Sequence, residues 1–158
     1  MNRVVSYLIR FAVIIGGYVV SAMATSAFLN VVTLASLGFT ADDAPAAALG
    51  SMVFSIPFIA LFVAYFAFIP SVVAILISEI FGLRDWLYHA LAGGVVAAVV
   101  IGFFRGAAEA GNEAAADPRF ALGIIGGGMC GGIGYWLIAG RTAGSWREQP
   151  RDVTSPAP

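Results

Sequence analysis

Long apolar stretches alternate with short polar segments along this chain. The apolar stretches cover residues of about 4–37, 46–81, 86–104 and 120–139. One helical crossing of a bilayer takes about 20 apolar residues. Each stretch is therefore predicted to be a membrane-spanning helix, since a helix bonds all its backbone polar groups within its own segment. The pattern predicts an all-α integral membrane protein, a four-helix bundle of up-down-up-down topology.

The first two stretches exceed what one crossing requires. As a helix, residues 4–37 would extend roughly 50 Å at about 1.5 Å per residue, so we expect tilt or protruding ends. A cleaved signal peptide ending near residues 21–24 is the alternative, but the apolar character continues beyond that point and favours an uncleaved anchor. The second stretch contains Pro57 and Pro70. We expect one kinked crossing, the alternative being two half-length segments broken at Pro70.

The arginines predict how the bundle is oriented. If the N-terminus is cytoplasmic, six arginines lie inside and two outside, in agreement with the positive-inside rule. We therefore expect residues 1–140 to form a single transmembrane domain with both termini in the cytoplasm. Residues 141–158, polar and with several prolines, are expected to be a disordered cytoplasmic tail. The inside set is Arg3, Arg10, Arg84, Arg141, Arg147 and Arg151, and the outside set is Arg105 and Arg119.

The composition supports a membrane location and limits the possible partners. Of the 158 residues, 60% are hydrophobic and 11% are charged, whereas soluble domains average about 25% charged residues. The lipid bilayer is thus the expected environment. The net charge of -1, without a basic patch, predicts no nucleic-acid partner. The single cysteine, Cys130, excludes an internal disulfide and a cysteine-cluster metal site, and we expect no cofactor.

Rows of small residues mark the predicted helix-packing faces. A face with almost no side chains lets another helix approach closely. The faces of the third and fourth helices are expected to dock as a hairpin or to bind a further copy. On the second helix, a seam of small residues is expected to pack against a near-antiparallel neighbour at about 20°. The rows are Gly123, Gly127 and Gly131, with Gly128 and Gly132 beside them; Gly94, Ala98 and Gly102; and Ala60, Ala64, Ala67, Ser71, Ala74 and Ser78.

A cluster of ionisable residues surrounds the expected turn after the second helix. It comprises Glu79, Arg84, Asp85 and His89. Ionisable groups in spans are costly and therefore mark candidate sites. One interpretation is a proton-binding Glu79 with His89 as a relay. The other is a Glu79–Arg84 ion pair that anchors the cytoplasmic rim, which the distance from the membrane midplane favours. Arg10 is expected to extend toward the headgroups.

The sequence gives little indication of catalysis. It has one histidine, no close carboxylate pair and no serine with a His-Asp arrangement, so we expect no enzymatic activity. The hydroxyl groups within the spans are expected to bond to the backbone or across helix interfaces.

Two stretches together resemble a known group of proteins. They are residues 79–88, continuing to Ala92-Gly93-Gly94, and residues 131–141. They are similar to uncharacterised small four-helix inner-membrane proteins of alphaproteobacteria. The resemblance implies a bacterial inner-membrane location and a cytoplasmic end at Trp136–Arg141, and it carries over no functional residue.

These observations predict a non-enzymatic accessory or assembly component of the bacterial inner membrane, which is multi-pass. We expect it to form a homo-oligomer or to join a larger membrane complex through the row of Gly123, Gly127 and Gly131. The alternative is a small transporter or channel subunit that uses Glu79 as a proton-binding carboxylate.

Overall fold

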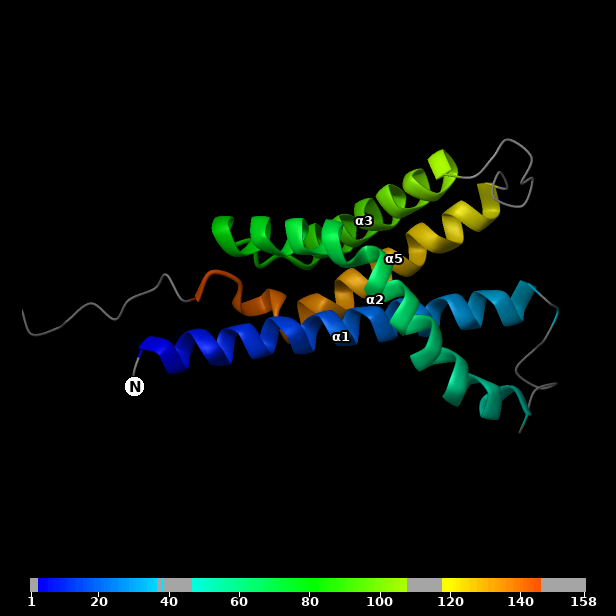
Figure 1. Ribbon diagram of the computed structural model, residues 1–158, viewed down its shortest axis with the longest axis horizontal. Helices are drawn as coiled ribbons and strands as arrows, with labels where there is room; N and C mark the ends of the chain where they lie inside the picture. Colours follow the sequence, from blue (N-terminus) through cyan, green and yellow to red (C-terminus); the bar gives the residue numbers. More distant parts are fainter. Residues whose placement is uncertain (1–2, 37, 39–46, 108–117, 146–158) are drawn as a thin grey trace, which may run out of the picture.

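The computed structural model describes residues 3–36, 38, 47–107 and 118–145. In these ranges the chain is helical (Figure 1), with α1 (Arg3–Ser36), α2 (Ala47–Phe81), α3 (Trp86–Ala107), α5 (Pro118–Ile138) and the short 3-10 helix η1 (Gly140–Thr142). The four α-helices are each long and apolar enough to cross a membrane. The four predicted helices are therefore confirmed, and their ends lie close to the expected ones.

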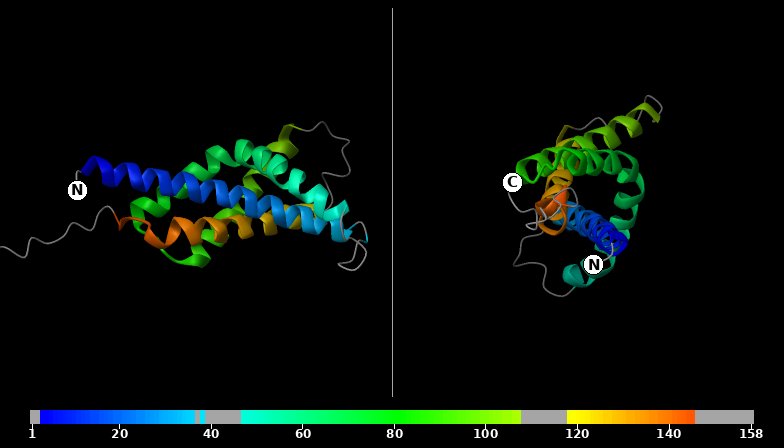
Figure 2. Two further views of the ribbon diagram at one scale, coloured as in Figure 1. Left: turned by 90° about the horizontal axis from the view of Figure 1, so that it is seen from below. Right: turned by 90° about the vertical axis from the view of Figure 1, so that its left-hand side faces the viewer.

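The second helix continues through both of its prolines. Figures 1 and 2 show that α2 is bent, crosses α1 and runs on to the turn that leads into α3. A proline lacks the N–H that would bond to the carbonyl one turn earlier, which loosens the helix at that point. The prediction of a single kinked helix is confirmed, and the alternative of two segments broken at Pro70 is wrong.

The fourth predicted helix, α5, makes backbone contact with α3. A Cβ atom on Gly128 would lie 2.4 Å from the Gly93 carbonyl oxygen, and one on Gly132 would lie 2.0 Å from the His89 carbonyl oxygen. Real Cβ contacts are essentially never shorter than 3.0 Å. The two helices can therefore approach this closely only because these positions are glycine.

The other glycine row of α5 packs against α1. A Cβ atom on Gly131 would lie 2.1 Å from Thr25 Oγ1, and one on Gly127 would lie 3.4 Å from both Leu29 and Phe28. The row of Gly123, Gly127 and Gly131 therefore faces α1 within the chain and is not free for a further copy. The predicted docking of the third and fourth helices as a hairpin is seen for the row of Gly128 and Gly132, which contacts α3.

The row predicted on α3 is displaced from the one that makes contact. Gly93 and the buried Ala97 face α5, whereas Ala98 is exposed and Gly102 has nothing within 4 Å of an added Cβ. Gly94 does contact α5, where an added Cβ would lie 3.1 Å from Met129 Cγ. Neighbouring residues of a helix point about 100° apart, so a row that is shifted by one position faces a different direction and a different neighbour. The prediction was therefore wrong for Ala98 and Gly102.

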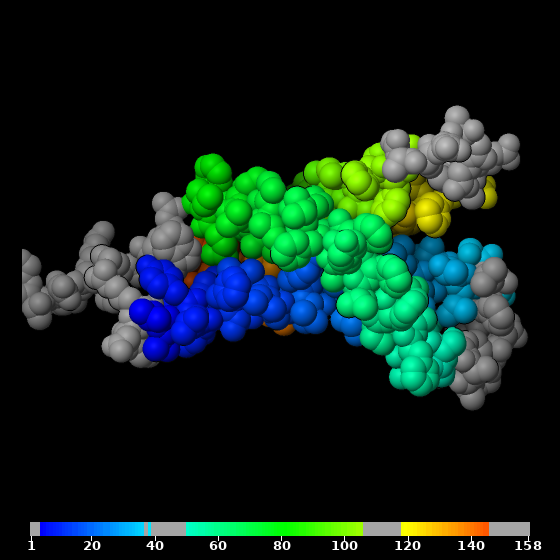
Figure 3. Space-filling view, in the orientation of Figure 1, coloured from blue at the N-terminus to red at the C-terminus, as the bar shows by residue number. Residues whose placement is uncertain are grey.

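Side-chain hydrogen bonds join α1 to α2 where the two helices cross. Ser26 Oγ donates to the Ile56 carbonyl oxygen at 2.7 Å, and Ser55 Oγ donates to Asn30 Oδ1 at 2.6 Å. These bonds confirm that hydroxyl groups in the spans serve helix interfaces. These bonds also attach the first half of α2 to the second half of α1. The rest of α2 lies over the outer side of the other helices (Figure 3).

Replacing Gly132 with alanine should destabilise the protein by about 1–3 kcal/mol, because the added methyl group overlaps the α3 backbone. The matched control is Gly102→Ala, which has open space and should be neutral or stabilising by up to about 1 kcal/mol through helix propensity. Thermal unfolding of both variants in the same detergent measures the difference. Equal stability of the two variants would contradict the backbone contact between α3 and α5.

Candidate functional site

An ion pair between Arg10 and Glu79 joins the beginning of α1 to the end of α2. The guanidinium group donates to both carboxylate oxygens. The two side chains are only 11% and 9% exposed. Bidentate pairs of this type are the stronger and more directional charge-assisted contacts. Glu79 therefore pairs with Arg10 instead of the expected Arg84, and Arg10 turns into the protein instead of extending to the headgroups.

The same ion pair holds the segment that follows α5. Arg10 also donates to Thr142 Oγ1 at 2.6 Å and to the Ala139 carbonyl oxygen at 3.1 Å. The Gly144 N–H donates to Glu79 Oε2 at 3.1 Å. Gly144 has φ +70°, a conformation that glycine adopts without strain. We call the end of the bundle that contains Arg10, the α2–α3 turn and η1 the η1 end.

Residues 141–144 were expected to begin a disordered tail, and this prediction is wrong. Arg84 Nε donates to the Ala143 carbonyl oxygen at 3.0 Å, and the Arg141 guanidinium lies 4.4 Å from the Trp136 ring centroid. A helix end leaves carbonyl groups without partners inside the helix, and here arginine side chains from α1 and from the α2–α3 turn bind carbonyl groups at and after the end of α5. Residues 146–158 lie outside the described part of the chain.

Asp85 and His89 have local structural roles at the start of α3. Asp85 Oδ1 accepts a hydrogen bond from the Leu87 N–H at 3.1 Å, which caps the helix. His89 Nδ1 lies 2.8 Å from the Asp85 carbonyl oxygen. Because a carbonyl can only accept, Nδ1 carries a proton. The predicted cluster is therefore assembled around the turn, with Glu79, Asp85 and His89 each bound to a neighbour in the fold.

Tyr135 is a buried partner of His89 that the sequence analysis missed. The two rings stack with centroids 5.6 Å apart, and each residue is 5% exposed. Among the described residues, neither His89 Nε2 nor the Tyr135 hydroxyl has a hydrogen-bond partner. A Cβ atom on Gly140 would lie 2.8 Å from Nε2, so η1 covers this edge. No sequence signal identifies the pair, because the two residues are 46 positions apart and meet only when α3 packs on α5.

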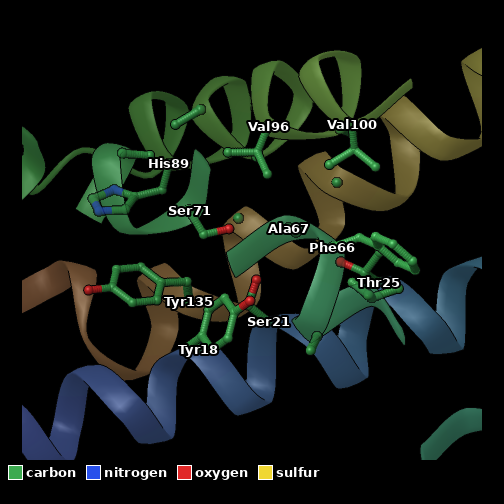
Figure 4. Close-up of a pocket in the computed structure, with 18 of the residues that line it drawn as sticks. Tyr18, Ser21, Thr25, Phe66, Ala67, Ser71, His89, Val96, Val100 and Tyr135 are labelled. Atoms are coloured by element: carbon green, nitrogen blue, oxygen red, sulfur yellow. The ribbon is translucent and has the colours of Figure 1, made fainter. Parts of the chain in front are cut away.

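A cavity of about 260 Å³ separates the inner face of α2 from α1, α3 and α5. The His89 and Tyr135 rings contribute to its wall at the η1 end, with their polar atoms pointing away from Val96 and Val100 (Figure 4). Arg10 and Glu79 are not among the lining residues. Most of the wall is apolar, and much of it is made of small residues: Ala22, Ala67, Ala74, Ala92, Gly93, Ala97, Gly128 and Gly132.

The cavity exists because α2 meets its neighbours through large side chains. The Tyr18 hydroxyl on α1 donates to the Ala64 carbonyl oxygen, and the Tyr88 hydroxyl on α3 donates to the Ala74 carbonyl oxygen at 3.2 Å. The Phe66 and Phe104 rings also meet edge to face, with centroids 4.8 Å apart. These aromatic groups act as spacers between the helices.

Part of the small-residue seam of α2 faces the space that the spacers leave open. It was expected to pack closely against a neighbouring helix. Instead, Ala67, Ser71, Ala74 and Ser78 line the cavity, whereas Ala60 is buried near the crossing with α1. The prediction of close packing is therefore wrong for Ala67, Ser71 and Ala74, whereas Ser78 at the η1 end is only 1% exposed.

The described residues include no group of three or more His, Cys, Asp or Glu side chains that could hold a metal ion. Comparisons of the chain with protein-family models, curated proteins and solved structures give no match. The interpretation of the cavity therefore depends on its own chemistry. The cavity is an apolar space that can hold a hydrocarbon group, and the stacked rings of His89 and Tyr135 close one end of it.

Replacing Arg10 with methionine should destabilise the protein by about 3–5 kcal/mol, because a buried carboxylate is left without its counter-ion. The double variant Arg10→Met, Glu79→Leu should recover most of this loss, since it removes both charges together. A double-variant cycle of thermal unfolding in detergent measures the coupling. Additive effects of the two substitutions would contradict a structural ion pair.

Proposed function

We propose that this protein is a non-enzymatic accessory protein of the bacterial inner membrane that binds a hydrocarbon chain of a membrane component. The observation that supports this proposal is the apolar cavity between α2 and the other helices. The four α-helices that line it are also those long and apolar enough to span a bilayer. On this proposal the cavity lies among the hydrocarbon chains of the bilayer, which surround the spanning helices.

The cavity suits a slender apolar group better than water or a bulky ligand. Apolar cavities do not hold water stably, but they bind small hydrocarbons. Pockets for drug-sized ligands usually measure about 300–1,000 Å³, and this cavity of about 260 Å³ is somewhat smaller. One hydrocarbon chain is therefore the expected occupant, with the bulk of the ligand remaining in the bilayer.

The alternative of a transporter or channel subunit using Glu79 receives less support. The Glu79 carboxylate is bound by Arg10 and by the Gly144 N–H, and it does not line the cavity. A proton-coupled role would require this carboxylate to release both partners. Association with further copies or a larger complex stays part of our proposal. It has to use a surface other than the row of Gly123, Gly127 and Gly131, because α1 packs on that row.

We also propose an up-down-up-down topology with both termini in the cytoplasm. The distribution of positive charge supports it, because cytoplasmic ends of membrane helices carry an excess of arginine and lysine. Arg10, Arg84 and Arg141 gather at the η1 end, where they bind Glu79, Ala143 and the Trp136 ring. Arg105 and Arg119 lie at the end of α3 and the beginning of α5.

Replacing Ala67 with phenylalanine should abolish binding of a hydrocarbon chain, because the added ring fills the cavity. The matched control is Ala98→Phe, which adds the same ring at an exposed position of α3 outside the cavity. The measurement is photolabelling of the purified protein with a diazirine-bearing alkane, followed by mapping of the labelled peptides.

The unsubstituted protein and Ala98→Phe should both be labelled at residues that line the cavity, and Ala67→Phe should lose this labelling. Thermal unfolding should show that all three proteins are folded. Undiminished labelling of the cavity in folded Ala67→Phe would refute the proposed function.

The topology has its own test. A green fluorescent protein fused after Pro158 should fluoresce, because it folds in the cytoplasm and not when exported unfolded. An alkaline phosphatase fused at the same position should be inactive, because it needs the oxidising outer side. The opposite pair of results would place the C-terminus outside.

A further inference from the structure

The wall of the cavity reaches the surface of the protein at three phenylalanines. Of the described residues that line the cavity, only Phe62, Phe66 and Phe104 are exposed, with 50%, 42% and 45% of their surface accessible. All the other lining residues are buried or half-buried. An exposed apolar side chain on a membrane-spanning helix faces lipid. The cavity is therefore separated from the lipid by these three rings, which we call the portal.

The portal rings come from two different helices. Phe62 and Phe66 lie one turn apart on α2, and Phe104 lies in the last turn of α3. The rings of Phe66 and Phe104 meet edge to face, with centroids 4.8 Å apart. Such a ring pair is a modest attraction that adds little to the burial of the rings. The portal is thus closed by a contact between two side chains and not by backbone packing.

The helix α2 is weakened next to the portal. Pro70 lies in α2 one turn after Phe66. A proline has no N–H, so it cannot donate the hydrogen bond that the Phe66 carbonyl oxygen would accept in a regular helix. Helices bend most readily where such a bond is missing. The Ala64 carbonyl oxygen before this point and the Glu79 carboxylate after it are both bound by side chains of α1. A loose point of α2 therefore lies beside the portal, between two attached points.

The opposite end of the cavity is closed more firmly. Figure 4 shows Phe66 at one end and the rings of His89 and Tyr135 at the other. Those two residues are each only 5% exposed. The backbone of η1 covers them, since a Cβ atom on Gly140 would lie 2.8 Å from His89 Nε2. A hydrocarbon chain that entered there would have to displace this backbone, whereas at the portal it meets only apolar side chains.

We infer that the hydrocarbon chain enters and leaves the cavity sideways from the bilayer, between α2 and α3, when the Phe66 and Phe104 rings separate and α2 bends at Pro70. The inference rests on the proposed function and adds the route by which the ligand reaches the site. A chain that uses this route stays in apolar surroundings throughout. The rest of its molecule can remain in the bilayer while the chain is bound.

The test measures how fast a diazirine-bearing alkane enters and leaves the cavity of the full chain in detergent. Light flashes at increasing delays after mixing give the entry rate, and flashes after addition of excess unlabelled alkane give the release rate. In Phe66→Ala and in Phe104→Ala both rates should rise about threefold to tenfold, because opening no longer has to separate the ring pair. The matched control is Phe54→Ala, which removes a ring that is 79% exposed on α2 and does not line the cavity.

The entry rate distinguishes a gate from an ordinary residue of the wall. Loss of a packing contact with the ligand would speed release alone, whereas easier opening speeds entry as well. Pro70→Ala should have the opposite effect, because its N–H can bond to the Phe66 carbonyl oxygen and stiffen α2. Both rates should then fall about twofold to tenfold, the range expected from one hydrogen bond.

The possible outcomes separate the inference from the function beneath it. Unchanged entry rates in folded Phe66→Ala and Phe104→Ala would overturn the portal, while labelling of the cavity at equilibrium would still support chain binding. Equal acceleration in Phe54→Ala would also overturn it, because the effect would not be specific to the portal. Unchanged or faster exchange in folded Pro70→Ala would overturn the hinge. Failure of the probe to label the cavity of the unsubstituted protein would reject the proposed function itself.

Discussion

The arrangement of this protein depends on backbone contact between α5 and its two neighbours. Gly128 and Gly132 bring α5 against the α3 backbone, and Gly127 and Gly131 bring it against α1. In lipid there is no hydrophobic force that favours one helix pairing over another, so close van der Waals contact becomes the main source of specificity. A helix with glycine on two sides can have two such neighbours. The core that results is correspondingly made mostly of alanine, with Tyr135 as its one large buried apolar side chain among the described residues.

The position of α2 follows a different principle. It is attached by polar bonds near its crossing with α1, by the ion pair at its end, and by aromatic groups between these points. The aromatic side chains hold α2 away from its neighbours, while the residues of α2 between them are small. The space that is left between the helices is the cavity. The Arg10–Glu79 pair has a structural consequence here, because it fixes the end of α2 and the segment after α5 together. The carboxylate that stood out in the sequence is thereby explained by its place in the fold.

Much of the fold could be predicted, and much less of the site. The helix ranges follow from apolar length alone, and the kinked α2 follows from Pro57 and Pro70. The glycine rows on α5 were recognised as packing faces and α3 as one partner, but the packing of α1 on the row of Gly127 and Gly131 was not predicted, since a row of small residues does not identify what approaches it. The Glu79–Arg84 pair was expected because those residues are close in sequence. Arg10 is 69 positions away and became the partner through the pairing of α1 with α2.

The sequence by itself determined that four long apolar segments form helices, because a bilayer permits few other ways of bonding the backbone. It also determined which residues are small enough for close approach. Only the tertiary structure decided that α1 and α3 occupy the two glycine rows of α5, that Ala98 and Gly102 face outward, and that His89 meets Tyr135. It also decided that the seam of α2 borders a cavity instead of a helix. The reason is geometric: a rotation of about 100° per residue and spacers from distant helices determine which faces meet.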